Sequence, residues 1–218
     1  SLSDVNTVVS GKGVLLQGTK DFYVSFRMRN SNHAETIISK GKPGIGTSFR
    51  LGCLINEDQD SRKNFVASVM ATENNTTVTL SDYNTGVIFS SGTGNITADT
   101  QTFTLNAGQC IVFTGYSNVT ANLDGIIGGL ITSNKPVAVN TGNALGGIDN
   151  GRADLTLDQI VSASQIGTDY IFIEGNGSNL MENPLIVAHE NNTDIYINGS
   201  TAPITTINAG QYYLVPNS

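Results

Sequence analysis

The chain contains the same series of short segments twice, and this repetition constrains its fold more than any other feature. ATENNTTVTL at residues 71–80 and TFTLNAGQCIVF at 102–113 return as VAHENNTDIYI at 187–197 and TTINAGQYYLV at 205–215. A further pair of similar segments, GTKDFYVSF and GTDYIFIEG, precedes the two copies. Because a repeated supersecondary unit buries its apolar surface in the same way each time, we expect two copies of one structural unit.

The two copies differ in the segments between these shared strings. The second copy lacks 15 residues between ENNT and NAGQ, and the first carries a further insertion between Arg29 and Phe65. GLITSNKPVAVNTGN at residues 129–143 has no counterpart in the second copy. We therefore expect residues 1–150 to form the first unit and residues 151–218 a shorter, truncated unit packed on it, within a longer polypeptide. Function is expected in the inserted loops, which the copies do not share.

Short apolar runs, rich in Val and Ile and separated by NN, NAG, NG, SNKP and GG, predict β-strands joined by tight turns. We interpret ENNT and NAGQ as turns of a β-meander, in which Asn and Gly adopt positive φ. The pattern predicts an all-β fold of antiparallel β-sandwich-like units. Only residues 155–164 indicate a helix, one or two turns long, with Asp154 as N-cap. The predicted strands are 65–70, 76–80, 102–105, 109–113, 126–132, 137–140, 170–174, 184–189, 194–198 and 211–215.

The sequence argues against nucleic-acid binding and against a membrane-spanning segment. Only 13% of the 218 residues are charged, and the net charge is −7. Nucleic-acid binding needs clustered Lys and Arg to contact phosphates, so we predict no nucleic-acid partner. No stretch approaches the roughly 18 consecutive apolar residues that a membrane span needs.

Several strings taken together resemble a known family. FRLGCLIN, ATENNTTVTL, LNAGQ, GLITSNKPVAVNTGN, LTLDQIVSASQIGTDYIFIEG and NPLIVAHENNTDIYING are similar to the domain family named after the amino-terminal part of the IgG Fc-binding protein. The chain looks most like bacterial members found in large secreted surface proteins of Bacteroidota, including gliding-motility adhesins exported by the type IX secretion system. The resemblance runs from about Gly18 to the end. It implies an exported cell-surface β-domain and supplies no catalytic mechanism or binding residues.

The chain departs from the animal members of that family at one place. After the equivalent of SNKPVAV those members have cysteines and a Cys-Asp-His stretch, whereas this chain has NALGGIDNGRADLTLDQ, without Cys or His. We therefore predict no antibody binding.

The two cysteines, Cys53 and Cys110, lie in apolar strand-like runs. In an exported protein they are candidates for one disulfide, which stabilises by roughly 2–4 kcal/mol. The alternative is two buried free thiols that pack as small hydrophobic groups. Neither cysteine belongs to a CxxC pair or lies near a His in the sequence, which disfavours metal and redox roles.

Two acidic loops are the candidates for a metal site. NEDQDS contributes Asp58 and Asp60, and IDNGRAD contributes Asp149 and Asp154. Calcium binds several hard oxygen ligands from carboxylates, Asn amides and backbone carbonyls, so either loop is a calcium candidate. Neither loop follows an EF-hand pattern, and the alternative is that both are solvated. We predict no other cofactor.

Catalytic patterns are nearly absent, and we predict that the chain is not an enzyme. The two histidines, His33 and His189, have no nucleophile-elbow Ser to activate. The glycine-rich strings GKPGIG and GGIDNG lack the Lys-Ser/Thr ending of a phosphate-binding loop. A glycosidase is a further alternative. It needs two carboxylates about 5–10 Å apart, and each of the two acidic loops would have to supply one of them.

Two functions remain. In the first, the chain is part of a secreted bacterial adhesin for attachment or gliding motility, and loops of the first copy contact a glycan, a surface protein or another surface. In the second, it is a spacer in a multi-domain surface filament and contacts only neighbouring domains. Both place the chain outside the cell, on the cell surface.

Overall fold

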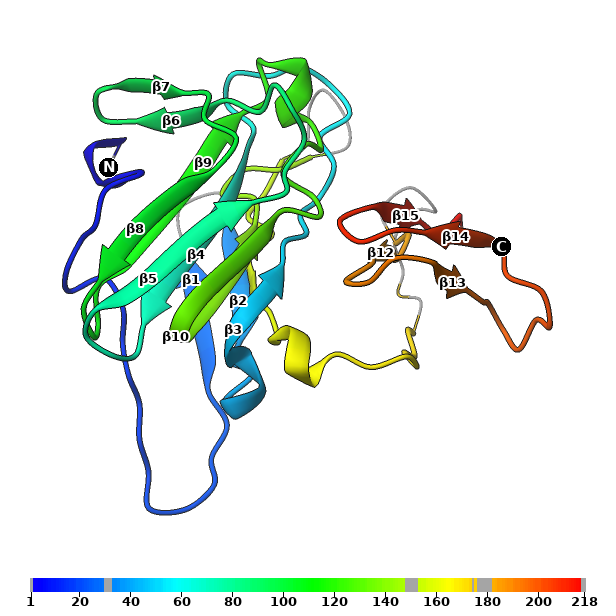
Figure 1. The fold of residues 1–218 in the computed structure, drawn as a ribbon, viewed down its shortest axis with the longest axis horizontal. Coiled ribbons are helices and arrows are strands. Elements are labelled where there is room, and N and C mark those ends of the chain that lie inside the picture. The colour runs from blue at the N-terminus through cyan, green and yellow to red at the C-terminus, as the bar shows by residue number, and fades with distance from the viewer. Residues whose placement is uncertain (1, 30–32, 148–152, 174, 176–181, 217–218) are drawn as a thin grey trace.

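The computed structural model describes residues 2–29, 33–147, 153–173, 175 and 182–216. Among them β-strands dominate, and the helical elements are short 3₁₀ turns, so the all-β prediction is confirmed (Figure 1). The strands are β1 (Ser25–Arg29), β2 (Ala34–Ile38), β3 (Ile45–Arg50), β4 (Asn64–Ala71), β5 (Thr76–Ser81), β6 (Phe89–Ser91), β7 (Gly94–Ile96), β8 (Gln101–Leu105), β9 (Cys110–Tyr116), β10 (Leu130–Gly142), β11 (Asp158–Gln159), β12 (Leu185–Val187), β13 (Thr193–Ile195), β14 (Thr205–Ile207) and β15 (Tyr212–Leu214). The 3₁₀ turns are η1 (Leu2–Asp4), η2 (Lys42–Gly44), η3 (Thr120–Asn122) and η4 (Ala163–Gln165).

The main sheet has the strand order β8-β5-β10-β4-β9, and β3 and β11 also pair with β10. All its pairs are antiparallel. In β4, side chains alternate between the interior and the surface, with Phe65, Ala67, Val69 and Ala71 buried. This period of two is what an apolar core on one face of a strand requires.

The shared strings ENNT and NAGQ lie where a long two-stranded ribbon bends. β4 pairs with β9 from Asn64 opposite Tyr116, and β5 pairs with β8 from Thr76 opposite Leu105. The register changes by one residue between the two pairs, which is the effect of a β-bulge. The second copy repeats the arrangement, because β12 pairs with β15 and β13 with β14, with the same one-residue change.

Reciprocal hydrogen bonds hold the two turns together, and we call this arrangement the clasp. In the first copy Asn75 N donates to Asn106 Oδ1 at 3.1 Å, and Ala107 N donates to Asn74 Oδ1 at 3.1 Å. In the second copy the corresponding distances are 3.0 Å and 3.2 Å. The bonded atoms of the second copy are Asn192 N with Asn208 Oδ1 and Ala209 N with Asn191 Oδ1.

Positive φ angles explain the residue types at the clasp. Asn75 and Asn192 have φ of 55° and 57°, and Gly108 and Gly210 have φ of 77° and 78°. Asn and Gly are the residues that adopt this left-handed conformation at least cost. The predicted turn chemistry is therefore confirmed. The predicted β-meander is wrong, because β4 pairs with β9 and β8 with β5, and neither pairs with the strand that follows it in sequence.

In the first copy the long strand β10 adds to the same ribbon. Its residues 130–133 pair with β5, its residues 137–142 pair with β4, and its register against β3 shifts between Thr132 and Val137. At this shift Thr72 Oγ1 donates to Pro136 O at 2.6 Å, and Lys135 Nζ donates to Asn74 O at 2.5 Å. SNKP, ENNT and NAGQ therefore meet at one bend of the sheet, and β10 joins its two halves.

The bent sheet encloses the main hydrophobic core. Aromatic side chains meet edge to face around Phe89, whose ring centroid lies 5.5 Å from that of Phe65 and 6.3 Å from that of Phe113. The strand β10 contributes Ile131, Val137 and Val139, all fully buried. β10 is thus part of the core as well as part of the sheet.

The second unit contacts the first through its clasp and through β15. A Cβ on Gly128 would lie 1.8 Å from Gly210 O, so only glycine permits this approach of the two backbones. Tyr212 Oη donates to Asp124 Oδ2 at 2.7 Å. Figure 1 shows β12–β15 beside the larger sheet. The division of the chain at residue 150 stays a prediction, because residues 148–152 lie outside the described part.

Three other details differ from expectation. Residues 155–164 form β11 and the turn η4 instead of a helix, because β11 adds to the edge of β10. Strands were predicted at 126–132 and 137–140, but residues 130–142 form one strand that continues through Pro136. Residues 170–173 form no strand, and residue 174 lies outside the described part. No helix in the described ranges is long and apolar enough to span a membrane.

Candidate functional site

Four loops of the first unit meet at the ends of the strands that point away from the clasp, and we call them the loop platform. They are residues 51–63, 82–100, 117–129 and 143–147. The first of them lies in the insertion that the second copy lacks, and the second carries the small hairpin β6–β7. Asn56 N donates to Leu123 O at 3.1 Å, and Asn84 N donates to Gly125 O at 2.9 Å. The platform is therefore a continuous hydrogen-bonded structure.

Buried asparagine side chains fix the loops to one another. Asn143 is fully buried, accepts a hydrogen bond from Leu54 N at 2.9 Å and donates to Asn64 O at 2.8 Å. Asn122 accepts from Ile88 N and donates to Ile88 O, both at 2.9 Å. A buried amide needs its hydrogen bonds satisfied, so each of these side chains orders the backbone segments that it contacts.

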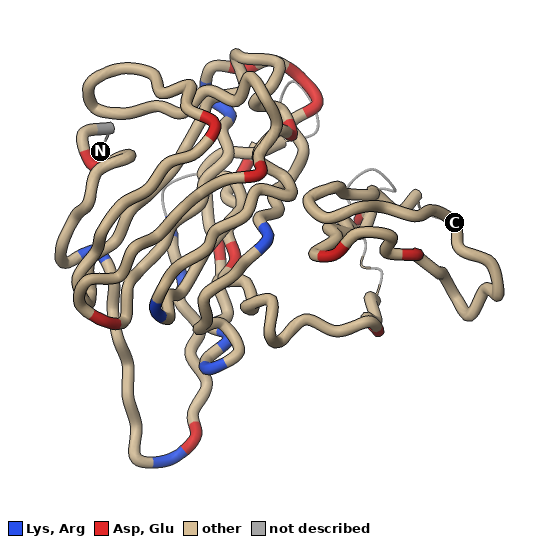
Figure 2. The backbone as a smooth tube through the Cα atoms, in the orientation of Figure 1, with Lys and Arg blue, Asp and Glu red and all other residues tan. Residues whose placement is uncertain are grey.

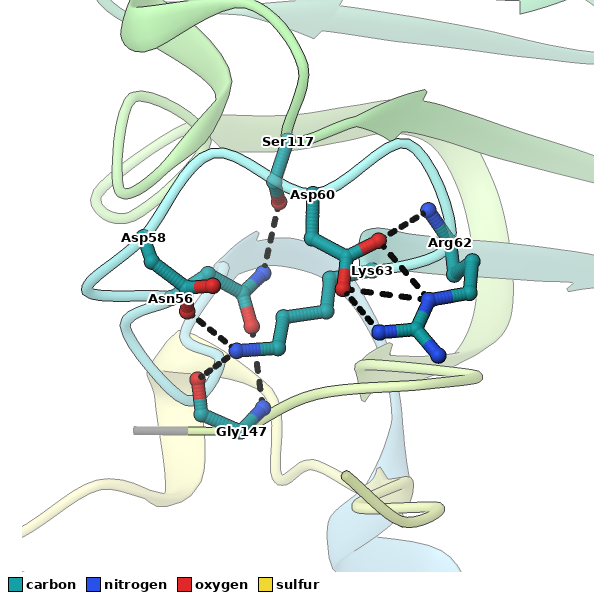
Figure 3. A network of polar contacts seen from close by, with 7 residues as sticks. All are labelled: Asn56, Asp58, Asp60, Arg62, Lys63, Ser117 and Gly147. Atoms are coloured by element: carbon teal, nitrogen blue, oxygen red, sulfur yellow. Dashed lines mark hydrogen bonds and ion pairs between the residues drawn. The ribbon is translucent and has the colours of Figure 1, made fainter. Parts of the chain in front are cut away.

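Lys63 is the centre of a polar network within the platform (Figure 3). Its side chain is 2% exposed, forms an ion pair with Asp58 and donates to Gly147 O at 3.1 Å. Asn56 completes the network, since its Nδ2 donates to Ser117 Oγ at 2.8 Å and its Oδ1 accepts from Gly147 N at 3.0 Å. The network brings the NEDQDS loop against the start of the glycine-rich loop at Gly146, a contact that sequence spacing did not indicate.

Asp60 forms a second ion pair within the same loop. Arg62 Nη2 donates to Asp60 Oδ2 at 2.6 Å, and Arg62 N donates to Asp60 Oδ1 at 2.8 Å. These hydrogen bonds from Arg62 lower the pKa of Asp60 to about 2. Asp60 is consequently ionised and paired at neutral pH.

The predicted calcium ligands do not gather into one site. Asp58 and Asp60 are paired with Lys63 and Arg62, while Asp154 accepts from His33 Nδ1 at 2.9 Å. Asp149 lies outside the described residues. Among the residues that are described, no group of three or more His, Cys, Asp and Glu side chains could hold a metal ion. Calcium stays a prediction, and the bound cationic side chains weigh against it at Asp58 and Asp60.

The two cysteines occupy different surroundings as free thiols. Burial, followed by the nearby negative charge of Asp124, raises the pKa of Cys53 to about 12. Burial also raises the pKa of Cys110, whose backbone bonds to that of Val9. Both thiols are free in the structure, with Cys110 buried and Cys53 half-buried, and the pairing of the two cysteines stays a prediction. Thiols with raised pKa values are poor nucleophiles, so neither is a candidate reactive group.

Sequence reasoning missed Lys63, Asn122 and Asn143, which order the platform. Lys and Asn are surface residues in most proteins, so a single sequence offers no signal that these three are buried. The weak signal that exists is position, because Lys63 lies two residues before the predicted strand 65–70 and Asn143 three residues after the predicted strand 137–140.

The exposed surface of the platform is polar and largely uncharged. Its exposed positions include Gln59, Asn84, Thr93, Asn95 and Asn118. Amide and hydroxyl groups present donors and acceptors together, and loops held by a rigid scaffold are common binding surfaces. The arrangement suits recognition of a polar partner by hydrogen bonds.

Comparisons with known proteins give one family. A family model described as IgGFc binding protein matches residues 34–218. No curated protein and no solved structure matches the chain. The matched range contains the bend strings ENNT, NAGQ and SNKP and the whole loop platform.

Proposed function

The chain belongs to the IgGFc binding protein family, and we propose that it is a non-enzymatic binding domain that contacts its partner through the loop platform. The observation that carries this proposal is the order of the platform, in which buried Asn56, Asn122 and Asn143 fix loops whose outer positions are exposed amides and hydroxyls. Preorganised loops lose less conformational entropy on binding.

We further propose that the domain belongs to a secreted bacterial surface adhesin that serves attachment or gliding motility. Its partner would be an extracellular glycan or a surface protein with exposed hydrogen-bonding groups. Support comes from the resemblance of its strings to such surface proteins and from the exposed amide and hydroxyl groups of the platform. We expect no binding to IgG Fc, because residues 143–159 lack the cysteines and the Cys-Asp-His stretch of the animal members.

Two pKa directions support a non-enzymatic role. A general acid needs a pKa raised toward neutrality. The pKa of Asp60 is lowered by Arg62, and that of Asp154 is lowered by the backbone N–H of Leu155 and then by His33. Neither carboxyl therefore has the property that a glycosidase acid requires.

The test is binding to an array of extracellular glycans and to whole cells, with IgG Fc included. Asn84→Arg and Asn118→Arg place large charges on exposed platform positions, and we expect them to reduce binding at least about tenfold. Thr201→Arg, on an exposed loop of the second unit, is the matched control and should bind as the wild type does.

The alternative function is a spacer without a ligand of its own. It is favoured by the position of the second unit, which packs on the first through Gly128 and Tyr212 as a neighbouring module in a filament would. Absence of glycan, Fc and cell binding by the wild type, or equal binding by the platform variants and Thr201→Arg, would support the spacer and contradict the binding platform.

A further inference from the structure

Strands β4 and β5 of the first unit are paired along both edges. Their counterparts β12 and β13 are paired along one edge among the described residues. In the first unit β4 pairs with β9 and β10, and β5 pairs with β8 and β10. Within the described residues β12 pairs with β15 alone, and β13 with β14 alone. Unpaired strand edges present rows of N–H and C=O groups that accept an added strand.

The core of the second unit is open at the same place. Val78 and Leu80 of β5 are fully buried in the first unit. Their counterparts in the repeat, Ile195 and Ile197, are only half-buried. In the first unit Ile131, Val137 and Val139 of β10 complete the core over these positions. The second unit thus lacks the apolar side chains that β10 supplies.

A buried polar atom marks the missing contact independently. Thr72 donates from both its backbone N and its Oγ1 to Pro136 O of β10. Its counterpart in the second unit is His189, and the Nδ1 of His189 is buried without a hydrogen-bond partner. Asn183 Oδ1, just before β12, is also buried without one. Buried groups of this kind need a partner, because an unpaired buried polar atom is costly.

The acidic charge of the second unit would complement the lysine that β10 carries. Residues 184–216 contain Glu190 and Asp194 but no Lys or Arg (Figure 2). In the first unit Lys135 of β10 donates to Asn74 O beside Glu73. The counterparts of these two residues are Asn191 and Glu190, so a lysine at the same position would meet the same carbonyl and a carboxylate.

We propose that the second unit is completed by a β10-type strand. This is an extended segment from outside residues 1–218 that adds antiparallel to β12 and β13. It has apolar residues at the positions of Ile131, Val137 and Val139 and a Lys-Pro pair at the bend. The second unit is then an acceptor for strand addition, a role separate from binding by the loop platform.

The test uses the whole 218-residue chain and a synthetic peptide of residues 129–143 as the probe. Backbone groups of successive strand residues point to opposite edges. Pro136 O accepts from Thr72 N on the β4 side, and Val139 O accepts from Ile160 N on the other side. N-methylation of the peptide at Ala138 and Asn140 therefore removes donors that would face β12. N-methylation at Val137 and Val139 removes donors that would face away and serves as the matched control.

We expect the unmodified and control peptides to bind saturably and to protect the amides of β12 and β13 from hydrogen exchange. The peptide methylated at Ala138 and Asn140 should bind weaker by about tenfold or more, because it lacks two strand hydrogen bonds. Absence of binding, or equal binding by the two methylated peptides, overturns the proposal. Dimers of the chain alone with protected β12 and β13 amides also overturn it, since a second copy would then occupy the edges.

Discussion

The two bent ribbons of this molecule share their clasp and differ in burial. The hydrogen bonds between the ENNT and NAGQ turns match atom for atom, and the distances agree within 0.1 Å. Yet β4 alternates buried and half-buried residues, whereas the three residues of β12 are all half-buried. Local turn chemistry therefore sets the path of the ribbon, while full burial of its apolar side chains requires the third strand that β10 provides.

Truncation of matched apolar side chains tests this difference most strongly. Leu80→Ala removes a fully buried side chain and is expected to lower the free energy of unfolding by about 3–5 kcal/mol. Ile197→Ala, at the equivalent half-buried position, should cost about 1 kcal/mol. Urea unfolding followed by circular dichroism measures both. Equal losses would mean that the second unit is as well packed as the first.

The buried ion pair of Lys63 with Asp58 belongs to the first unit, so its removal should act through the loop platform. Lys63→Met leaves Asp58 beside Gly147 without its cation and is expected to cost about 2–3 kcal/mol, reduced from a fully buried pair because Asp58 is 20% exposed. Lys63→Met combined with Asp58→Leu should recover most of that loss. A double variant as unstable as the single one would show that the other contacts of Lys63 dominate.

Substitution of the clasp asparagines should affect the two copies to the same degree. Asn106→Ala and Asn208→Ala each remove the acceptor of one turn amide, at a cost of about 1 kcal/mol. Hydrogen exchange at the amides of Asn75 and Asn192 measures the loss locally. If only Asn106→Ala increased exchange, the second clasp would be weaker than its geometry indicates.

The smallest effect concerns the acidic end of the pH range. The folded pKa of Asp60, about 2, lies below its ordinary value near 3.9, so its pair with Arg62 stabilises above about pH 4. That contribution is lost as the pH falls from about 4 to about 2. Carboxyl NMR titration should give the low midpoint in the wild type and a midpoint near the ordinary value in Arg62→Gln. An unchanged midpoint in the variant would assign the shift to another group.

Part of the fold was predictable because it depends on local chemistry. Alternating apolar residues gave most strands of the main sheet, and Asn75 and Gly108 were recognisable as positive-φ turn residues. Strands β1, β2 and β3 were missed, because their apolar residues are sparse and β1 is exposed on both faces. The helix predicted at 155–164 failed because pairing of β11 with the edge of β10 overrides local propensity.

The candidate site was less predictable than the fold. Both acidic loops were identified, but their charges were assigned to a metal, whereas Asp58 and Asp60 bind side chains of the chain itself. Lys63 could not be recognised as buried, because its burial arises from packing of residues 51–63 against residues 143–147. Such contacts between distant segments leave no pattern in a single sequence.

The all-β class, the duplication and the turn residues could be read from the amino-acid sequence, because they follow from periodicity and backbone preference within a few residues. Three features became visible only in the folded chain: ENNT, NAGQ and SNKP meet at one bend, Lys63 is buried, and His189 Nδ1 is buried without a hydrogen-bond partner. Strand pairing and burial depend on which distant segments come together. The duplicated strings therefore form the same clasp in both units. In the first unit β10 adds a third strand that completes the hydrophobic core.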